Sequence, residues 1–236
     1  DTDHSEFVGR IVKPWDFVDN NSDVEDDNGH GTHVAGTAGA ANNNIGVTGV
    51  AYDANIMPLD VFHTYYDSSG NLRWGANNAN TSSAIRYATD NGADVINLSL
   101  GSYTPSPLLF SALQYAEQNN VVCVMAAGNG DPVTGIGYSS PGYPARYATD
   151  YGVAVGADSI YKTITNYSDK AGNTTLNYVT APGGTLAMGI FSSWNDGGYN
   201  TIPGTSMASP HVAGIVSLLR SYDSTLKVNE IKNLLT

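Results

Sequence analysis

The chain has 236 residues, which is long enough to bury one sizeable core, so we expect a single domain. Charged residues make up only 14% of it, and the formal net charge is −12. An acidic chain without clustered Lys and Arg is a poor ligand for a phosphate backbone, and no apolar stretch approaches the roughly 18 residues of a membrane span. We therefore expect neither nucleic acid nor a membrane as a partner.

An acidic stretch near the N-terminus raises the question of a bound cation. Six carboxylates lie within "DFVDNNSDVEDDNGHG", at Asp16, Asp19, Asp23, Glu25, Asp26 and Asp27. Carboxylates this close repel one another unless water solvates them or a cation bridges them. The pattern leaves both a solvated acidic loop and a metal site open.

A helix is expected to begin near "HGTHVAGTA", directly after this stretch. His30 and His33 are three residues apart, and such pairs share a face when both lie on a helix. A third metal ligand is lacking, and the neighbouring glycines favour a turn at His30, so a metal held by these imidazoles is the lesser interpretation. His33 then follows a glycine-flanked turn and opens a helix of small residues.

Apolar runs of strand length alternate with helical segments through the middle of the chain. The runs "NIMPLDVF", "DVINLSL", "VVCVMAA" and "YGVAVGA" predict strands covered on both faces, and helices are expected over residues 80–91 and 107–119. This βαβ order indicates a parallel sheet with helices on both faces. Cys123 lies inside one of the runs, where we expect a buried, unreactive thiol.

The last strong helix, in "GTSMASPHVAGIVSLLRSY", starts with a candidate nucleophile. Its apolar stripe of Val212, Ile215, Val216 and Leu219 is expected to belong to the core. Ser206 at its start is either an N-cap or a reactive hydroxyl, and the stretch by itself favours the cap. Asn129, in "VMAAGNG", likewise admits a plain turn residue as its alternative.

Taken together, His33, Asn129 and Ser206 indicate a functional site more strongly than each residue does alone. All three lie at the ends of elements in a parallel α/β pattern, where such sheets gather their functional groups. A hydroxyl, an imidazole that accepts its proton and an amide directed at an oxyanion are the parts of a nucleophilic acyl-transfer site.

The stretches "DNGHGTHVAGT", "INLSLG", "AAGN" and "GTSMASPHVAG" closely resemble motifs of the subtilisin-like serine proteases, the subtilases or peptidase family S8. The likeness covers nearly the whole chain, and the motifs occur in the same order. It implies an α/β fold of three α/β/α layers around a mostly parallel sheet. Residues 1–236 would form one peptidase S8 catalytic domain.

The resemblance also implies roles for individual residues. Ser206 would be the acyl-forming nucleophile, His33 the general base and later acid, and Asn129 an oxyanion donor. The substrate would contact Gly70, Ser99, Leu100, Gly101, Ala126, Ala127, Gly128 and Gly142. Gly142 would close the bottom of the main pocket and leave depth for a large apolar or aromatic side chain, and Tyr143 and Pro144 match a family element with a cis peptide.

The position of the catalytic acid stays open. "HSEF", at His4 to Phe7, matches a family turn that follows the catalytic Asp by seven residues, which places the acid and its strand upstream of Asp1. The alternative makes Asp1 itself the acid. By the same resemblance a further strand and helix would follow "NEIKNLL", and we expect the 236-residue chain alone to be unstable and inactive or weakly active.

Calcium is the implied cofactor. "ANNNIGVTGVA" matches the family's calcium loop, with carbonyls of Ala41, Ile45 and Val47, the side chain of Asn43 and the carboxylate of Glu6 as ligands. Oxygen-only coordination suits a hard cation of this size. A second site within Asp16 to Asp27 is also considered.

The function expected from these residues is a serine endopeptidase of broad specificity that prefers large apolar residues on the acyl side of the cleaved bond. We expect it to be secreted and monomeric, with protein and peptide substrates and a pro-segment or protein inhibitors as partners. Two alternatives are a catalytically decayed, peptide-binding relative and a serine esterase. The esterase is disfavoured because "GTSMA" is not the "GxSxG" turn typical of that class.

Overall fold

The computed structural model describes residues 1–236, and its centre is a sheet of four parallel strands in the order β5-β6-β7-β8. These are β5 (Val95–Leu98), β6 (Val122–Ala126), β7 (Val153–Asp158) and β8 (Tyr178–Pro182). The first three confirm the strands expected from the apolar runs. Successive residues of β6 enter two different core clusters, one containing Cys123 and Met125 and the other Val122 and Val124. Both faces of the sheet are therefore covered.

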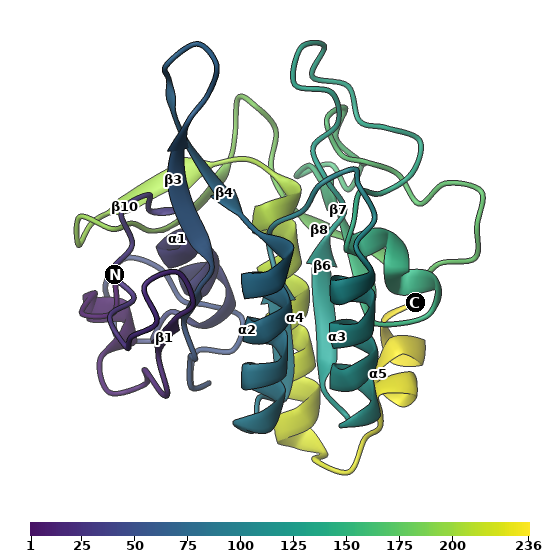
Figure 1. Ribbon diagram of the computed structural model, residues 1–236. Helices are drawn as coiled ribbons and strands as arrows, with labels where there is room; N and C mark the ends of the chain where they lie inside the picture. Colours follow the sequence, from purple (N-terminus) through teal and green to yellow (C-terminus); the bar gives the residue numbers. More distant parts are fainter.

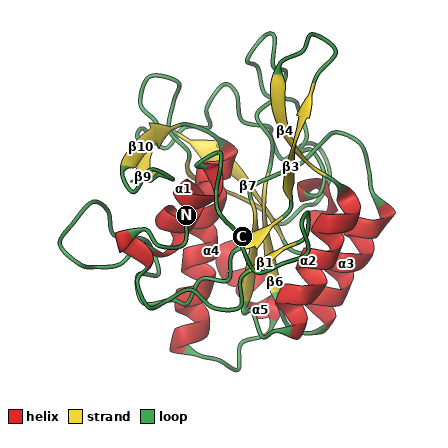
Figure 2. Ribbon diagram, turned by 60° about the vertical axis from the view of Figure 1, so that its left-hand side comes forward, coloured by secondary structure: helices red, strands yellow, loops and turns green.

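Helices complete the three layers (Figures 1 and 2). One core cluster joins the sheet to α2 (Asn78–Asp90) and α3 (Pro107–Gln118), and the other joins it to α4 (Thr205–Tyr222) and α5 (Val228–Leu235). Asn77 and Ser106 cap α2 and α3 with their side chains. The stripe expected on α4 holds for Val212 and Val216, but Ile215 is 41% exposed, because the core touches a narrower face of the helix.

The N-terminal part is less regular than expected. It contains η1 (Ser5–Phe7), β1 (Trp15–Asp16), α1 (His30–Gly39), β2 (Leu59–Asp60) and the hairpin of β3 (Phe62–Tyr66) and β4 (Leu72–Ala76). The run "NIMPLDVF" forms only the two residues of β2, which pair with β1, and the first residue of β3. A second hairpin, β9 (Ile190–Ser193) with β10 (Tyr199–Ile202), packs on α1, and η2 (Ala145–Thr149) packs on β7.

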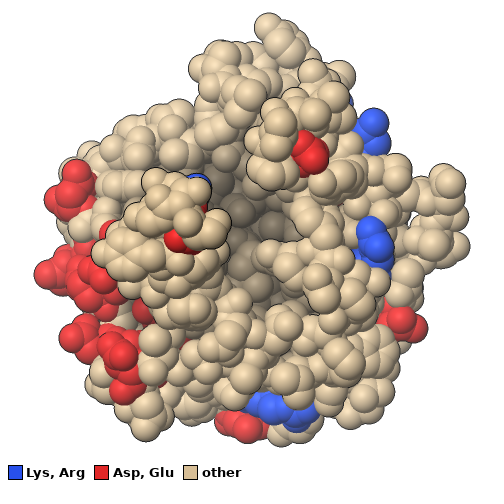
Figure 3. Space-filling view, turned by 45° about the horizontal axis from the view of Figure 1, so that its top comes forward, with Lys and Arg blue, Asp and Glu red and all other residues tan.

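A large cavity lies between the N-terminal part of the molecule and the four-stranded sheet. It measures about 2250 Å³ and is bordered by residues of α1, α2, β2 and β5. β5 is the last strand of the four-stranded sheet, and β1 and β2 form a separate pair. One backbone edge of β5 is thus unpaired and faces the cavity. Seen from the side where the β3–β4 hairpin projects, the molecule is deeply hollowed, with acidic side chains gathered along one edge (Figure 3).

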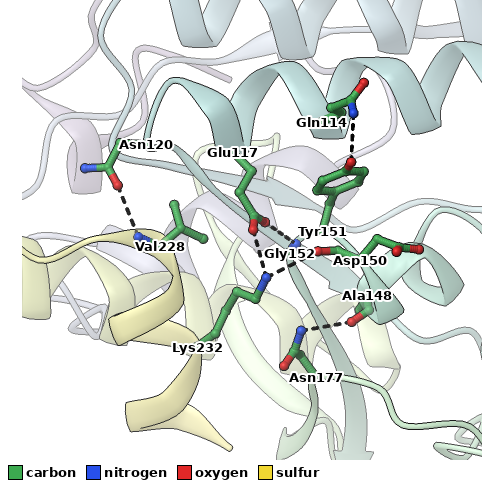
Figure 4. Close-up of polar contacts among 10 residues, drawn as sticks. All are labelled: Gln114, Glu117, Asn120, Ala148, Asp150, Tyr151, Gly152, Asn177, Val228 and Lys232. Atoms are coloured by element: carbon green, nitrogen blue, oxygen red, sulfur yellow. Dashed lines mark hydrogen bonds and ion pairs between the residues drawn. The ribbon is translucent and has the colours of Figure 1, made fainter.

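Polar contacts fasten α5 to the rest of the fold (Figure 4). Lys232 Nζ lies 2.8 Å from Glu117 Oε1 of α3 and also donates to the Asp150 carbonyl. The second oxygen of Glu117 accepts the Gly152 N–H. Asn120 accepts the Val228 N–H at the start of α5.

No helix of the structure is both long and apolar enough to span a bilayer.

Candidate active site

His33 lies on the first turns of α1, whose start depends on a glycine. Gly29, the N-cap, has φ +89°, and a β-carbon there would lie 2.4 Å from the Trp194 ring. Asp26 satisfies the open N–H groups of this turn, since its side chain accepts from Gly29 N and Thr32 N. α1 therefore begins at His30, where the sequence favoured a turn, and the reason is that Asp26 caps it.

The imidazole of His33 is fully buried and faces β9. Its Nε2 donates to the Ile190 carbonyl at 2.9 Å, so Nε2 carries the proton in the neutral ring and Nδ1 is a bare acceptor. Nδ1 has no hydrogen-bond partner. Burial lowers the pKa of His33, although the Ile190 carbonyl offsets part of this effect. The ring is thus a neutral base at neutral pH.

Ser206 is the second residue of α4 and contacts the strand end after β5. Its Oγ donates to the Ser99 carbonyl at 3.3 Å, and Ser99 Oγ donates back to the Ser206 carbonyl at 2.7 Å. No hydrogen bond joins Ser206 to His33, although α1 and α4 pack against each other. The hydroxyl is therefore placed at the carboxyl end of the sheet but is not paired with the imidazole.

Asn129 is oriented by the residue that precedes Ser206. Its Oδ1 accepts from both the N–H and the hydroxyl of Thr205, each at 2.9 Å. Thr205 Oγ1 also accepts the Gly128 N–H at 3.2 Å. With Oδ1 occupied, the Nδ2 group of Asn129 remains available as a donor beside Ser206. An amide N–H is the kind of donor that can stabilise an oxyanion.

One pocket of about 150 Å³ brings together most of the residues assigned to substrate binding. Asn129 and Ser206 line it, together with Leu100, Gly101, Ala126, Ala127, Gly128 and Gly142. Ser99 lies beside it through its contacts with Ser206. The bond between Tyr143 and Pro144 is cis, as the resemblance implied. Segments from three parts of the chain thus converge on one hydroxyl.

Gly70 does not belong to this pocket. It lies at the tip of the β3–β4 hairpin with φ +76°, and nothing lies within 4 Å of a β-carbon built on it. Asp67 closes that tip by accepting the Ser69 and Asn71 N–H groups. The structure thus places Gly70 at the hairpin tip and outside this pocket, and its expected role in substrate pairing stays a prediction.

Asp1 is buried next to α1 but is not paired with His33. Its α-amino group donates to Thr32 Oγ1 at 3.1 Å, and its Oδ1 has no hydrogen-bond partner. Asp1 Oδ1 and His33 Nδ1 are thus two buried polar atoms without partners, on neighbouring parts of the fold. A carboxylate that orients the imidazole is absent from the contacts of His33.

The residues of the expected calcium loop do come together. Glu6 is fully buried, with Oε1 accepting from Val47 N and the Tyr199 hydroxyl and Oε2 accepting from Asn43 Nδ2. The carbonyls of Ala41, Ile45 and Val47 accept no hydrogen bond within the chain. The Glu6 carboxylate and these free carbonyls are oxygen donors of the kind that suits a hard cation, although both Glu6 oxygens accept hydrogen bonds in this structure.

Elsewhere the structure offers little for a metal. Nowhere do three His, Cys, Asp or Glu side chains lie together in an arrangement that could hold a metal ion. This holds for the surroundings of His30 and His33 and for the stretch from Asp16 to Asp27. Asp16 and Asp26 use their carboxylates on backbone N–H groups. Burial acts to raise the pKa of Asp26, but its hydrogen bonds from Thr32, Gly29 and Asn28 outweigh burial and lower it.

The structure adds three residues that the sequence did not single out. Thr205 orients Asn129, Tyr103 lines the pocket, and Asp169 lies buried beneath it. An Asp in "YSDKAG" and a Tyr in "GSYTP" are typical of exposed loops, so only the spatial neighbourhood reveals them.

Comparison with known proteins identifies the family of this chain. The model of the subtilase family matches residues 1–236. Thermitase of Thermoactinomyces vulgaris is 38% identical over 93% of this chain and 71% of that protein, and subtilisin DY of Bacillus licheniformis is 37% identical over 96% and 76%. The crystal structure of a cold-adapted subtilisin-like serine proteinase superposes with a TM-score of 0.80 at 36% identity, over 99% of this chain and 76% of that one. The chain therefore belongs to the subtilase family of serine proteases.

Proposed function

We propose that the protein is a serine endopeptidase in which Ser206 is the nucleophile, His33 the proton acceptor and Asn129 the oxyanion donor. The observation that supports this most is the single pocket shared by Ser206, Asn129 and six of the expected substrate-binding residues. The apolar and glycine lining of that pocket favours a large apolar side chain on the acyl side of the cleaved bond.

The chemistry follows the acyl-transfer scheme of serine proteases. Ser206 Oγ attacks the scissile carbonyl while its proton passes to His33, and Asn129 Nδ2 donates to the oxyanion. Collapse of the tetrahedral intermediate releases the amine, which takes the proton from His33, and water then hydrolyses the acyl-enzyme. For the first step the His33 ring must turn from the Ile190 carbonyl toward Ser206 and adopt the neutral tautomer with its proton on Nδ1, so that Nε2 is the bare acceptor.

We also propose the wider setting that the family resemblance implies. Calcium would be held by Glu6, Asn43 and the carbonyls of Ala41, Ile45 and Val47, where it neutralises a buried carboxylate and links distant loops. The protein would be secreted and monomeric, act on proteins and peptides, and be controlled by a pro-segment or protein inhibitors.

A fluorophosphonate probe tests the catalytic assignment. The folded chain is treated with the probe, and the adduct is mapped by peptide mass. We expect one adduct, on Ser206, that disappears in S206A and forms much more slowly in H33A. Removal of an oxyanion donor costs roughly 10²-fold to 10³-fold in rate, so N129A should slow labelling by about 10²-fold.

S217A is the matched control, because Ser217 lies on the same helix and bonds only to the Ala213 carbonyl. Its labelling should equal that of the unmodified chain. Absence of label on a folded chain would show that no acid within residues 1–236, Asp1 included, completes the triad, and label on another serine would refute the assignment of Ser206.

A further inference from the structure

Tyr103 occupies the space that Gly142 leaves at the bottom of the pocket. A β-carbon built on Gly142 would lie 3.3 Å from Tyr103 Cε1 and 3.4 Å from Cδ1. The ring therefore lies where a side chain at position 142 would project, and Tyr103 lines the same pocket as Ser206. Since Tyr103 is also 48% exposed, its ring is a wall between the pocket and solvent.

A buried carboxylate holds this wall in place. Tyr103 donates its hydroxyl to Asp169 Oδ2 at 2.9 Å, and Asp169 Oδ1 accepts the Tyr138 N–H at 2.7 Å. Asp169 is fully buried, and its own N–H donates to the Gly128 carbonyl at 3.0 Å. The Tyr138 ring packs edge-on against Tyr103 with centroids 4.7 Å apart. The tyrosine is thus fixed at its hydroxyl and along its ring.

The carboxylate also lies directly against the opposite wall of the pocket. A β-carbon on Gly128 would come 2.3 Å from Asp169 Oδ2 and 3.2 Å from the Tyr103 hydroxyl. Burial raises the pKa of Tyr103, and its hydrogen bond to Asp169 raises it further, so the phenol stays a donor at neutral pH. Tyr103 and Asp169 together connect the Gly142 side of the pocket to the Gly128 side.

We propose that Tyr103, held by Asp169, is a specificity-determining residue that limits the pocket to aliphatic side chains of leucine or methionine size and disfavours aromatic ones. The inference rests on the proposed function and deepens it. Gly142 by itself indicates depth for an aromatic side chain, whereas the Tyr103 ring takes up that depth. The reaction at Ser206 is unchanged, and only the acceptable side chain is decided here.

Peptide binding tests the proposal without requiring turnover. The probes are two N-acetyl tetrapeptide amides identical except for a C-terminal Leu or Phe, and their Kd values are measured by calorimetry. The unmodified chain should bind the Leu peptide more tightly. One methylene in an apolar pocket changes discrimination by roughly 10-fold to 200-fold, so Y103A should shift the Phe-to-Leu ratio toward Phe by at least about 10-fold.

Two further variants distinguish the effect of the Tyr103 ring from the effect of its hydrogen bond to Asp169. Y103F keeps the ring but leaves Asp169 Oδ2 without its donor, and we expect a smaller shift in the same direction. Y138F is the matched control, because it removes only a surface hydroxyl that contacts Asp131 and leaves the Tyr103–Asp169 bond intact. An unchanged Phe-to-Leu ratio in both Y103A and Y103F would overturn the proposal.

Hydrolysis of the corresponding tetrapeptide anilides distinguishes this inference from the proposed function. If the variants shift the binding ratio while no chain cleaves an anilide, Tyr103 keeps its role and the catalytic proposal fails. If the anilides are cleaved with the same Phe-to-Leu preference in every variant, the catalytic proposal stands and the Tyr103 proposal is wrong.

Discussion

At the scale of single residues, burial decides the protonation state of three histidines around the contact between α1 and α4. Burial is the largest cause of the lowered pKa of His30, His33 and His211. His211 Nδ1 donates to the Met207 carbonyl at 2.8 Å, which opposes the effect of burial without cancelling it. All three rings are therefore neutral in the folded protein under conditions where a solvated imidazole is already partly charged.

The stability of the protein should consequently fall on mild acidification. Below about pH 6.5 the unfolded chain binds protons at these histidines while the folded chain does not, so protons favour unfolding. The loss continues until the pH reaches the lowered pKa values of the folded state. We expect a smaller free energy of unfolding in urea at pH 5 than at pH 7.5.

The variant H211Q should flatten this dependence, because it removes one of the three imidazoles that the unfolded chain protonates before the folded chain does. Equal free energies of unfolding at the two pH values would show that burial does not control these histidines.

At the scale of elements, α5 is held by one nearly buried ion pair. The side chains of Lys232 and Glu117 are 8% and 16% exposed, and Glu117 also accepts the Gly152 N–H ahead of β7. The pair joins the C-terminal helix to α3 and to the sheet (Figure 4). Removing one member leaves the other as an uncompensated, largely buried charge.

Replacing one member of this pair should therefore lower the free energy of unfolding more than replacing both members. Loss of one partner of a buried pair destabilises proteins by roughly 3 to 5 kcal/mol, while replacing both with uncharged groups of similar size is often neutral. We expect K232A to lower the free energy of unfolding by about 3 kcal/mol and the double variant E117Q/K232M to recover most of that loss. Urea denaturation measures both, and equal losses in the two variants would contradict the assignment.

At the scale of the whole molecule, distant segments meet at Glu6. This residue of η1 contacts the 41–47 loop and the Tyr199 hydroxyl of β10, which is 193 residues away in sequence. These contacts hold the N-terminal segment against the 41–47 loop and β10. Next to β5, in contrast, the N-terminal part borders the cavity of about 2250 Å³, and the edge of β5 is unpaired. A cation at Glu6 would stabilise this part of the fold because only the folded chain assembles the ligands.

Calcium should accordingly raise the melting temperature. A ligand at about 100 times its Kd stabilises the folded state by roughly 2.7 kcal/mol, which corresponds to about 5 to 10 °C for a chain of this size. We expect a shift of this order between millimolar calcium and EDTA, and its loss in E6Q.

The control is E25Q, which removes an exposed carboxylate from the acidic stretch. It should retain the calcium-dependent shift, and loss of the shift in E25Q instead of E6Q would place the cation in that stretch. A melting temperature that does not respond to calcium in the unmodified chain would refute the calcium site.

Local sequence patterns predict secondary structure correctly where an element buries its own apolar residues. β5, β6, β7, α2 and α3 follow from apolar runs and helical periodicity, and Cys123 is buried with its pKa raised to about 12, as its apolar neighbours indicated. The run "NIMPLDVF" failed as a strand because a strand also needs a paired neighbour, and only Leu59 and Asp60 find one in β1.

The sequence by itself determined the family and the three-layer fold, because those follow from the order and spacing of motifs along the chain, and it predicted His33, Asn129 and Ser206 as site residues. Only the tertiary structure decided that Gly70 lies outside the pocket, that His33 donates to Ile190, and that Tyr103 and Asp169 fill the space beside Gly142. These outcomes depend on contacts between residues up to 157 positions apart. Such contacts are set by packing of whole elements, and no local pattern of residues encodes them.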